Sequence, residues 1–117
     1  MSQERRRHPR VAKSLSLQLS HTSDDIITET SNISASGAYC IMKRFIPVLT
    51  KMRVKLSVPD ERTSKTISCE GIVVRVEPAH EQSKPTDYKV AIFFHDLTEH
   101  DRTVLAHYVQ QHISAAI

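Results

Sequence analysis

The stretch MRVKLSV, residues 52–58, decides the fold class, because apolar and polar side chains alternate along its whole length. Successive side chains of a β-strand point to opposite faces, so the four apolar residues from Met52 to Val58 would line one buried face. Pro59 and Asp60 follow directly and end the pattern. We therefore predict a strand with one face in a core and the other in water.

Five further segments carry strand patterns. They combine alternation or β-branched residues with flanking turn signals. Asp24 and Asp25 predict the first turn, and residues 77–86, which contain two prolines and no apolar period, predict a loop. The predicted strands are residues 15–20, 26–31, 38–42, 64–76 and 88–94.

Within residues 64–76 the apolar pattern changes its face. Ile67 and Cys69 share one face, whereas apolar residues beyond Gly71 occupy consecutive positions. A lone strand glycine at such a change marks a bulge or a barrel corner. We therefore predict a bulge or a barrel corner at Gly71.

After Asp96 the apolar spacing becomes that of an amphipathic helix, with an i, i+3, i+4 stripe. Thr98 can cap this helix because its hydroxyl can accept from the first-turn amides, and Asp101 completes a capping-box-like arrangement. Closure into a barrel would remove the exposed edges of six short strands. The predicted fold class is therefore mainly β, a six-stranded antiparallel barrel with a C-terminal helix.

The 117 residues suit one domain, in which 39% hydrophobic and 25% charged residues argue against both disorder and membrane insertion. The first ten residues are polar and basic, so we expect no secretory signal or lipid anchor and a cytoplasmic location. We expect residues 1–13 to be a flexible N-terminal arm and residues 14–117 to be the barrel domain.

Cysteine and histidine usage gives no metal signature. Cys40 and Cys69 are too few and too far apart for a disulfide framework or a CxxC knuckle, so we predict two buried free thiols. The last four histidines are spaced 5, 7 and 5 residues apart, with no HExxH and no Cys or carboxylate to complete a set. We predict no metal site.

The positive charge is concentrated in the arm. The net charge is +3, and without the four arginines of the first ten residues the chain has 12 basic against 13 acidic residues. A negatively charged partner should therefore meet the arm.

Two motifs stand out, RRHPR at residues 6–10, which reads RxxxR, and NISASG at residues 32–37, which reads NxSxxG. In this order, about 25 residues apart and with the second between two predicted strands, they resemble the PilZ domain family. Its members are bacterial receptors for the second messenger cyclic di-GMP. The resemblance runs from Glu4 to the terminal helix and implies cyclic di-GMP as the ligand, with no cofactor.

The first motif suits a ligand that carries two phosphates and two guanines. The planar forks of Arg6 and Arg10 can each grip a phosphate or the O6/N7 edge of guanine with two hydrogen bonds. Pro9 biases His8 towards extended geometry, so the two arginines should lie on an arm and not on one helical face. The resemblance implies that this arm clamps the ligand, and we expect it to become ordered on binding.

In the second motif, the Asn32 oxygen can accept from guanine N–H groups and the Ser34 hydroxyl can donate to phosphate or base. Gly37, in a chain with two glycines, suggests a positive φ or a close ligand approach. Each of the three could instead be an ordinary turn residue. Arg5 extends the first motif to RRxxxR, which in the family accompanies binding of an intercalated ligand dimer, and Arg7 is a solvated neighbour or a rim contact.

Two other residues bear on the site. Ala91 stands where the family often has the glycine of a GxxF pattern, and its methyl group could narrow the ligand's approach or fill the barrel wall. Tyr39 could stack on a base or pack within the fold.

Three other function classes were weighed. The first is an enzyme, but the sequence contains no GxSxG motif, no P-loop and no identifiable pair of catalytic carboxylates. A basic arm on a barrel can also hold nucleic-acid phosphates, but the chain has few aromatic residues for base stacking, so we expect no nucleic acid partner. A PilZ-like adaptor without ligand binding is the third.

The favoured hypothesis is a single-domain effector, a monomer or weak dimer. Ligand would close the arm on the barrel, and an unknown protein partner would detect the changed surface. The resemblance implies motility, exopolysaccharide synthesis or biofilm formation as outputs.

Overall fold

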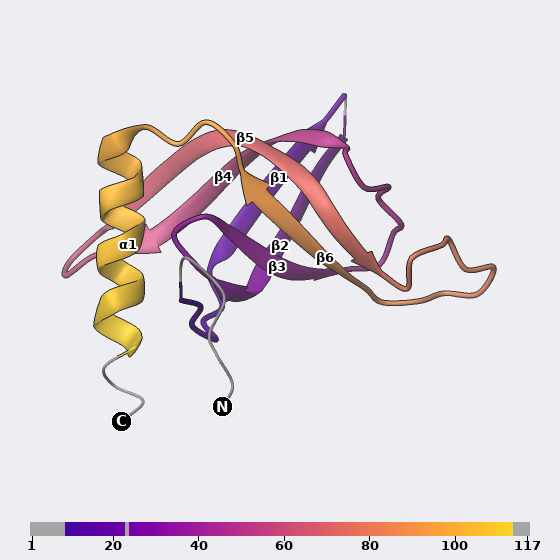
Figure 1. Cartoon of the computed structure of the whole chain (residues 1–117), viewed down its shortest axis with the longest axis horizontal. Coiled ribbons are helices and arrows are strands. Elements are labelled where there is room, and N and C mark those ends of the chain that lie inside the picture. The colour runs from indigo at the N-terminus through magenta and orange to yellow at the C-terminus, as the bar shows by residue number, and fades with distance from the viewer. Residues whose placement is uncertain (1–8, 23, 114–117) are drawn as a thin grey trace.

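The computed structural model describes residues 9–22 and 24–113. Within these ranges, six antiparallel strands close into a barrel and one helix follows (Figure 1). The order around the barrel is β1-β2-β3-β6-β5-β4, which places β3 and β4 on opposite sides. The predicted fold class is confirmed. The elements are β1 (Ser16–His21), β2 (Asp24–Ile33), β3 (Gly37–Met42), β4 (Lys51–Pro59), β5 (Ser64–Glu77), β6 (Tyr88–Phe94) and α1 (Glu99–Ile113).

The alternating stretch of β4 behaves as its sequence predicts. Met52, Val54, Leu56 and Val58 are all buried, and the residues between them face outward. They meet apolar side chains of β1 and β5, the two strands that pair with β4. Burial of each such side chain contributes about 1.5–3 kcal/mol. The barrel interior is therefore the core of the protein.

The first turn lies earlier than predicted. Asp24 and Asp25 do not form it, because both belong to β2 and Asp24 pairs with His21 of β1. Thr22 has a φ of 54°, the left-handed conformation that tight hairpin turns use. The ladder thus extends through two acidic residues whose side chains point to solvent.

The predicted bulge at Gly71 is wrong by three residues. Gly71 keeps the inward-facing alternation of β5, and the pairing with β6 shifts at Val74, which is 54% exposed. A Cβ on Gly71 would lie 2.6 Å from Val54 Cγ2 and 2.7 Å from Ile92 Cγ2. This glycine therefore serves packing across the barrel, while the extra residue at the bulge leaves Arg75 outside and puts Val76 on the buried face.

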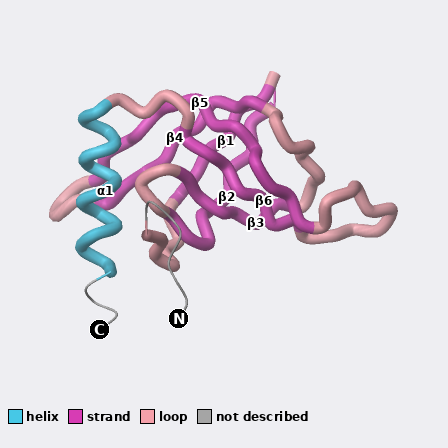
Figure 2. Tube along the Cα trace, viewed as in Figure 1, coloured by secondary structure: helices cyan, strands magenta, loops and turns pink. Residues whose placement is uncertain are grey.

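Helix α1 packs against β4 and lies beside the barrel (Figure 2). It buries Leu105, Tyr108 and Val109. The predicted cap is confirmed, since the Thr98 hydroxyl accepts from the Asp101 amide at 3.0 Å. Among the described residues, no helix has the length and apolar character needed to cross a bilayer.

Removal of the helix cap gives a first test of this fold. Thr98→Ala is expected to lower the free energy of unfolding by about 1 kcal/mol, because it leaves a first-turn amide without its acceptor. Urea denaturation followed by circular dichroism measures the change. Thr98→Ser keeps the hydroxyl and should match the wild type. An alanine variant as stable as the wild type would contradict a role for this hydrogen bond.

Both cysteines are free and buried, as predicted. Loss of hydration raises the pKa of Cys40 and of Cys69 to about 12. Both thiols therefore stay protonated at neutral pH and act as small apolar core residues. In the described part of the chain, no three His, Cys, Asp or Glu side chains gather closely enough to hold a metal ion.

Candidate ligand-binding site

The NxSxxG motif forms the turn between β2 and β3. Asn32 lies near the end of β2, where the pairing with β3 shifts its register, and Gly37 begins β3. The Ser34 amide donates to the Gly37 carbonyl at 2.9 Å and closes the turn. The motif therefore sits at one end of the barrel on two neighbouring strands.

Ser34 is engaged within this turn. It is buried, its hydroxyl accepts from the Ser36 amide at 3.1 Å, and the same hydroxyl lies 3.4 Å from the Gly37 carbonyl oxygen. A hydroxyl with these neighbours stabilises the local backbone. The structure thus shows a structural role for Ser34, and its contact with a ligand stays a prediction.

Asn32 has an unsatisfied oxygen. Its Oδ1 atom is buried and has no hydrogen-bond donor among the described residues. A buried acceptor without a partner costs about 1–3 kcal/mol. A donor brought by a ligand would remove this cost.

Gly37 is explained by a neighbouring strand. Its φ is not positive, so that part of the prediction is wrong. A Cβ at this position would collide with the Ile92 carbonyl oxygen and lie 3.3 Å from Phe93 Cα. The close approach that requires glycine is therefore that of the β6 backbone, and a ligand's approach here stays a prediction.

Arg10 is the residue of the RxxxR motif that the structure describes, and Arg5 and Arg6 lie outside the described residues. Next to it, Val11 is buried and exchanges two backbone hydrogen bonds of 2.9 Å with Ile33 of β2. These bonds bring the first motif to the second. The expectations for Arg5 and Arg6 rest on sequence alone.

Tyr39 connects the two motifs. It pairs with Asn32 across the β2–β3 ladder, and the Arg10 Cζ atom lies 4.5 Å from the centroid of its ring. Sequence reasoning left Tyr39 between base stacking and packing, and it missed this cation–π contact. The available signal was its position two residues after Gly37, on the outward face of a predicted strand.

A shallow hollow of about 110 Å³ lies among Arg10, the β2–β3 turn and strands β3, β5 and β6. Val74 and Phe93 line it and are 54% and 43% exposed. Ala91 also lines the hollow, and it is buried in the barrel wall. Its methyl group is therefore placed both to narrow a ligand's approach and to fill the wall. Apolar surface beside a guanidinium group suits a ligand with flat rings and negative charge.

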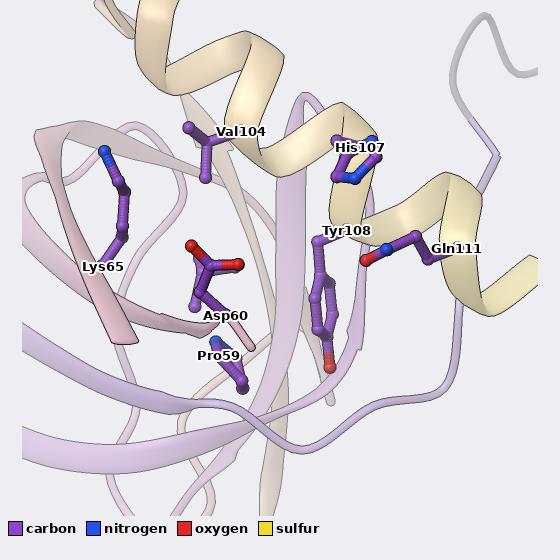
Figure 3. A pocket seen from close by; sticks show the side chains of 8 residues that line it. Pro59, Asp60, Lys65, Val104, His107, Tyr108 and Gln111 are labelled. Atoms are coloured by element: carbon purple, nitrogen blue, oxygen red, sulfur yellow. The ribbon is translucent and has the colours of Figure 1, made fainter. Parts of the chain in front are cut away.

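A second pocket, also of about 110 Å³, separates α1 from the β4–β5 turn (Figure 3). Asp60 approaches it from the β4–β5 turn and Lys65 from β5, and His107 and Tyr108 approach it from the helix. It contains no residue of either motif. The hollow beside Arg10 is therefore the candidate site.

Three solved structures share this fold. The Bacillus subtilis inhibitor of motility, MotI/DgrA, superposes with a TM-score of 0.83 at 21% identity, over 97% of this chain and 53% of that chain. The PilZ domain of Escherichia coli YcgR with c-di-GMP gives 0.67 at 9% identity, over 97% and 95%. The K. pneumonia MrkH–c-di-GMP complex gives 0.70 at 18% identity, over 97% and 53%. The chain spans about half the length of MotI and of MrkH.

Sequence comparison points to the same fold. A search of curated proteins gave no match. The family model of the PilZ domain matches residues 4–111, which include both motifs, all six strands and most of α1. On this match, the chain belongs to the PilZ domain family.

Proposed function

We propose that this protein is a cyclic di-GMP receptor that binds its ligand at the hollow beside Arg10. One observation carries the proposal. The buried Asn32 oxygen, which has no donor among residues 9–22 and 24–113, is linked through Tyr39 to the exposed Arg10 guanidinium. Guanine offers N–H donors to such an oxygen, and phosphate oxygens accept from guanidinium. The buried amide oxygen and the exposed guanidinium group are thus complementary to the two parts of one ligand.

The similar structures support this choice of ligand, because the YcgR and MrkH structures are c-di-GMP complexes. Family membership supports a receptor in preference to an enzyme. Ser34 and Gly37 line the hollow, and we infer that Asn32 completes this wall of the site when the ligand binds. Arg10 would form the opposite wall, and Arg5 and Arg6 would extend that wall along the arm.

In this proposal the ligand draws the part of the arm that precedes Arg10 onto the barrel, in the cytoplasm, and a protein partner detects the closed surface. A shift from 1:99 to 99:1 in favour of the closed state needs about 5.5 kcal/mol of differential binding. Several charge-assisted hydrogen bonds together can supply a free energy of that size. The inhibitor of motility among the similar structures favours motility control as the output.

A ligand-independent adaptor is the second candidate. It is favoured by the Ser34 hydroxyl, which is already bonded within its turn, and by the Ala91 methyl group in the hollow. Such an adaptor would act through its protein partner alone.

Isothermal titration with cyclic di-GMP, with GTP as the control ligand, separates the two candidates. Saturable heat at one or two ligands per chain, absent with GTP, is the expected result. A ratio of two would agree with the role predicted for Arg5. Equilibrium dialysis at the same concentrations distinguishes weak heat from absent binding. No binding in either assay would overturn the receptor and favour the adaptor.

A further inference from the structure

A second cation shares the ring that holds Arg10. Lys89 lies on the outer face of β6, the strand that pairs with β3 (Figure 1). Its Nζ atom is 4.8 Å from the centroid of the Tyr39 ring, and Arg10 Cζ is 4.5 Å from the same centroid. Neither the RxxxR motif nor the NxSxxG motif contains Lys89 or Tyr39. One aromatic ring thus gathers two positive charges.

Both charges lack an anionic partner among the described residues. Glu77 lies opposite Lys89 in the β5–β6 ladder, but its carboxylate pairs with Arg75 at 2.7 Å. The other described ion pairs join residues away from this ring. Within the described residues, therefore, no carboxylate competes with a ligand for Arg10 or Lys89.

Two neighbouring cations repel each other, and the negative face of an aromatic ring offsets part of that repulsion. A phosphate group would offset it further, because it neutralises positive charge and accepts hydrogen bonds from cationic side chains. Such a pair at the edge of the hollow fits a ligand with phosphodiester groups.

We propose that Tyr39 is a positioning residue that holds Arg10 and Lys89 together, and that Lys89 contacts a phosphate of the ligand. This inference rests on the proposed function, since it assigns a further contact to the same site. Arg10 provides a planar fork and Lys89 a compact point charge, so the two cations have different geometric requirements. The ring fixes the position of each before the ligand arrives.

Titration of four variants with cyclic di-GMP tests the proposal. Tyr39→Leu and Lys89→Gln are each expected to weaken binding about tenfold, whereas Tyr39→Phe keeps the ring and should stay within about twofold of the wild type. Lys55→Gln is the matched control, because Lys55 is an exposed strand lysine on β4, across the barrel from β3. Thermal denaturation establishes that each variant is folded.

Three titration results would overturn the proposal. Wild-type affinity of the Lys89→Gln variant for cyclic di-GMP would show that Lys89 does not contact the ligand. Equal losses in Tyr39→Phe and Tyr39→Leu show that the aromatic ring is not what matters. A tenfold loss in Lys55→Gln shows a non-specific effect of net charge.

A second measurement works without ligand. In the free protein, the ring current of Tyr39 should shift the Arg10 side-chain proton resonances upfield, and this shift should persist in Tyr39→Phe and vanish in Tyr39→Leu. If the wild type binds no cyclic di-GMP, the proposed function fails and the ring-current shift still tests the Arg10–Tyr39 contact. If the wild type binds and the shift is absent, the positioning role fails alone.

Discussion

Arg10→Ala is expected to weaken binding of cyclic di-GMP by at least about 100-fold while the barrel stays folded. The substitution removes a guanidinium group whose bidentate hydrogen bonds are worth about 1–3 kcal/mol for each pair. It also leaves the facing ligand group without a partner. A 100-fold loss of affinity corresponds to about 2.7 kcal/mol, which is within this range. Arg10 is exposed and contacts the Tyr39 ring, an interaction worth about 0.5–1 kcal/mol at such sites. The free energy of unfolding should therefore fall by no more than about 1 kcal/mol.

Isothermal titration and urea denaturation of the same preparation measure both quantities. Arg53→Ala is the matched control, because Arg53 is an exposed strand residue on β4, across the barrel from β3. Arg10→Lys keeps the charge without the planar fork and should fall between alanine and wild type. Arg6→Ala is expected to lose as much as Arg10→Ala on the motif alone. Binding by Arg10→Ala within about twofold of the wild type would refute the clamp.

The strands could be predicted because their signal is local. Alternation in β4 and β6 needs no knowledge of the partner strand, and the closed barrel follows from six such strands with short connections. The bulge could not be located in the same way. The position of the bulge, at Val74 and not at Gly71, is a property of the pairing between β5 and β6, and the local pattern of one strand does not contain that pairing.

In the site, too, some features could be predicted from the sequence and others depend on contacts between distant segments. The family resemblance carried by the two motifs implied that Arg10 and the β2–β3 turn belong to one site, and the Val11–Ile33 hydrogen bonds join them. The contacts of Tyr39 with Arg10 and Lys89 were missed, because they depend on long-range pairing. The Arg10 contact depends on the Val11–Ile33 bridge and on the β2–β3 register, and the Lys89 contact depends on the register between β3 and β6.

Gly37 tests whether a motif glycine serves the ligand or the fold, and Gly37→Ala is expected to lower the free energy of unfolding by about 3 kcal/mol. The added Cβ would meet the Ile92 carbonyl oxygen, which belongs to the paired backbone of β6 and not to a flexible side chain. Overpacking typically costs about 1–3 kcal/mol, and a backbone obstacle favours the upper end. Alanine also lowers the entropy of the unfolded chain, which stabilises the protein by less than about 1 kcal/mol. The collision is the larger effect, so the free energy of unfolding should fall.

Urea denaturation of Gly37→Ala beside Gly71→Ala measures this effect against a matched glycine. At Gly71 the obstacles are the methyl groups of Val54 and Ile92, which can shift by small rotations, so a smaller loss of about 1–2 kcal/mol is expected. A Gly37→Ala protein with wild-type stability and no affinity for cyclic di-GMP would show that the ligand alone requires this glycine. Loss of stability together with weaker binding by the folded fraction would instead show that β6 shapes the turn and that the turn shapes the site.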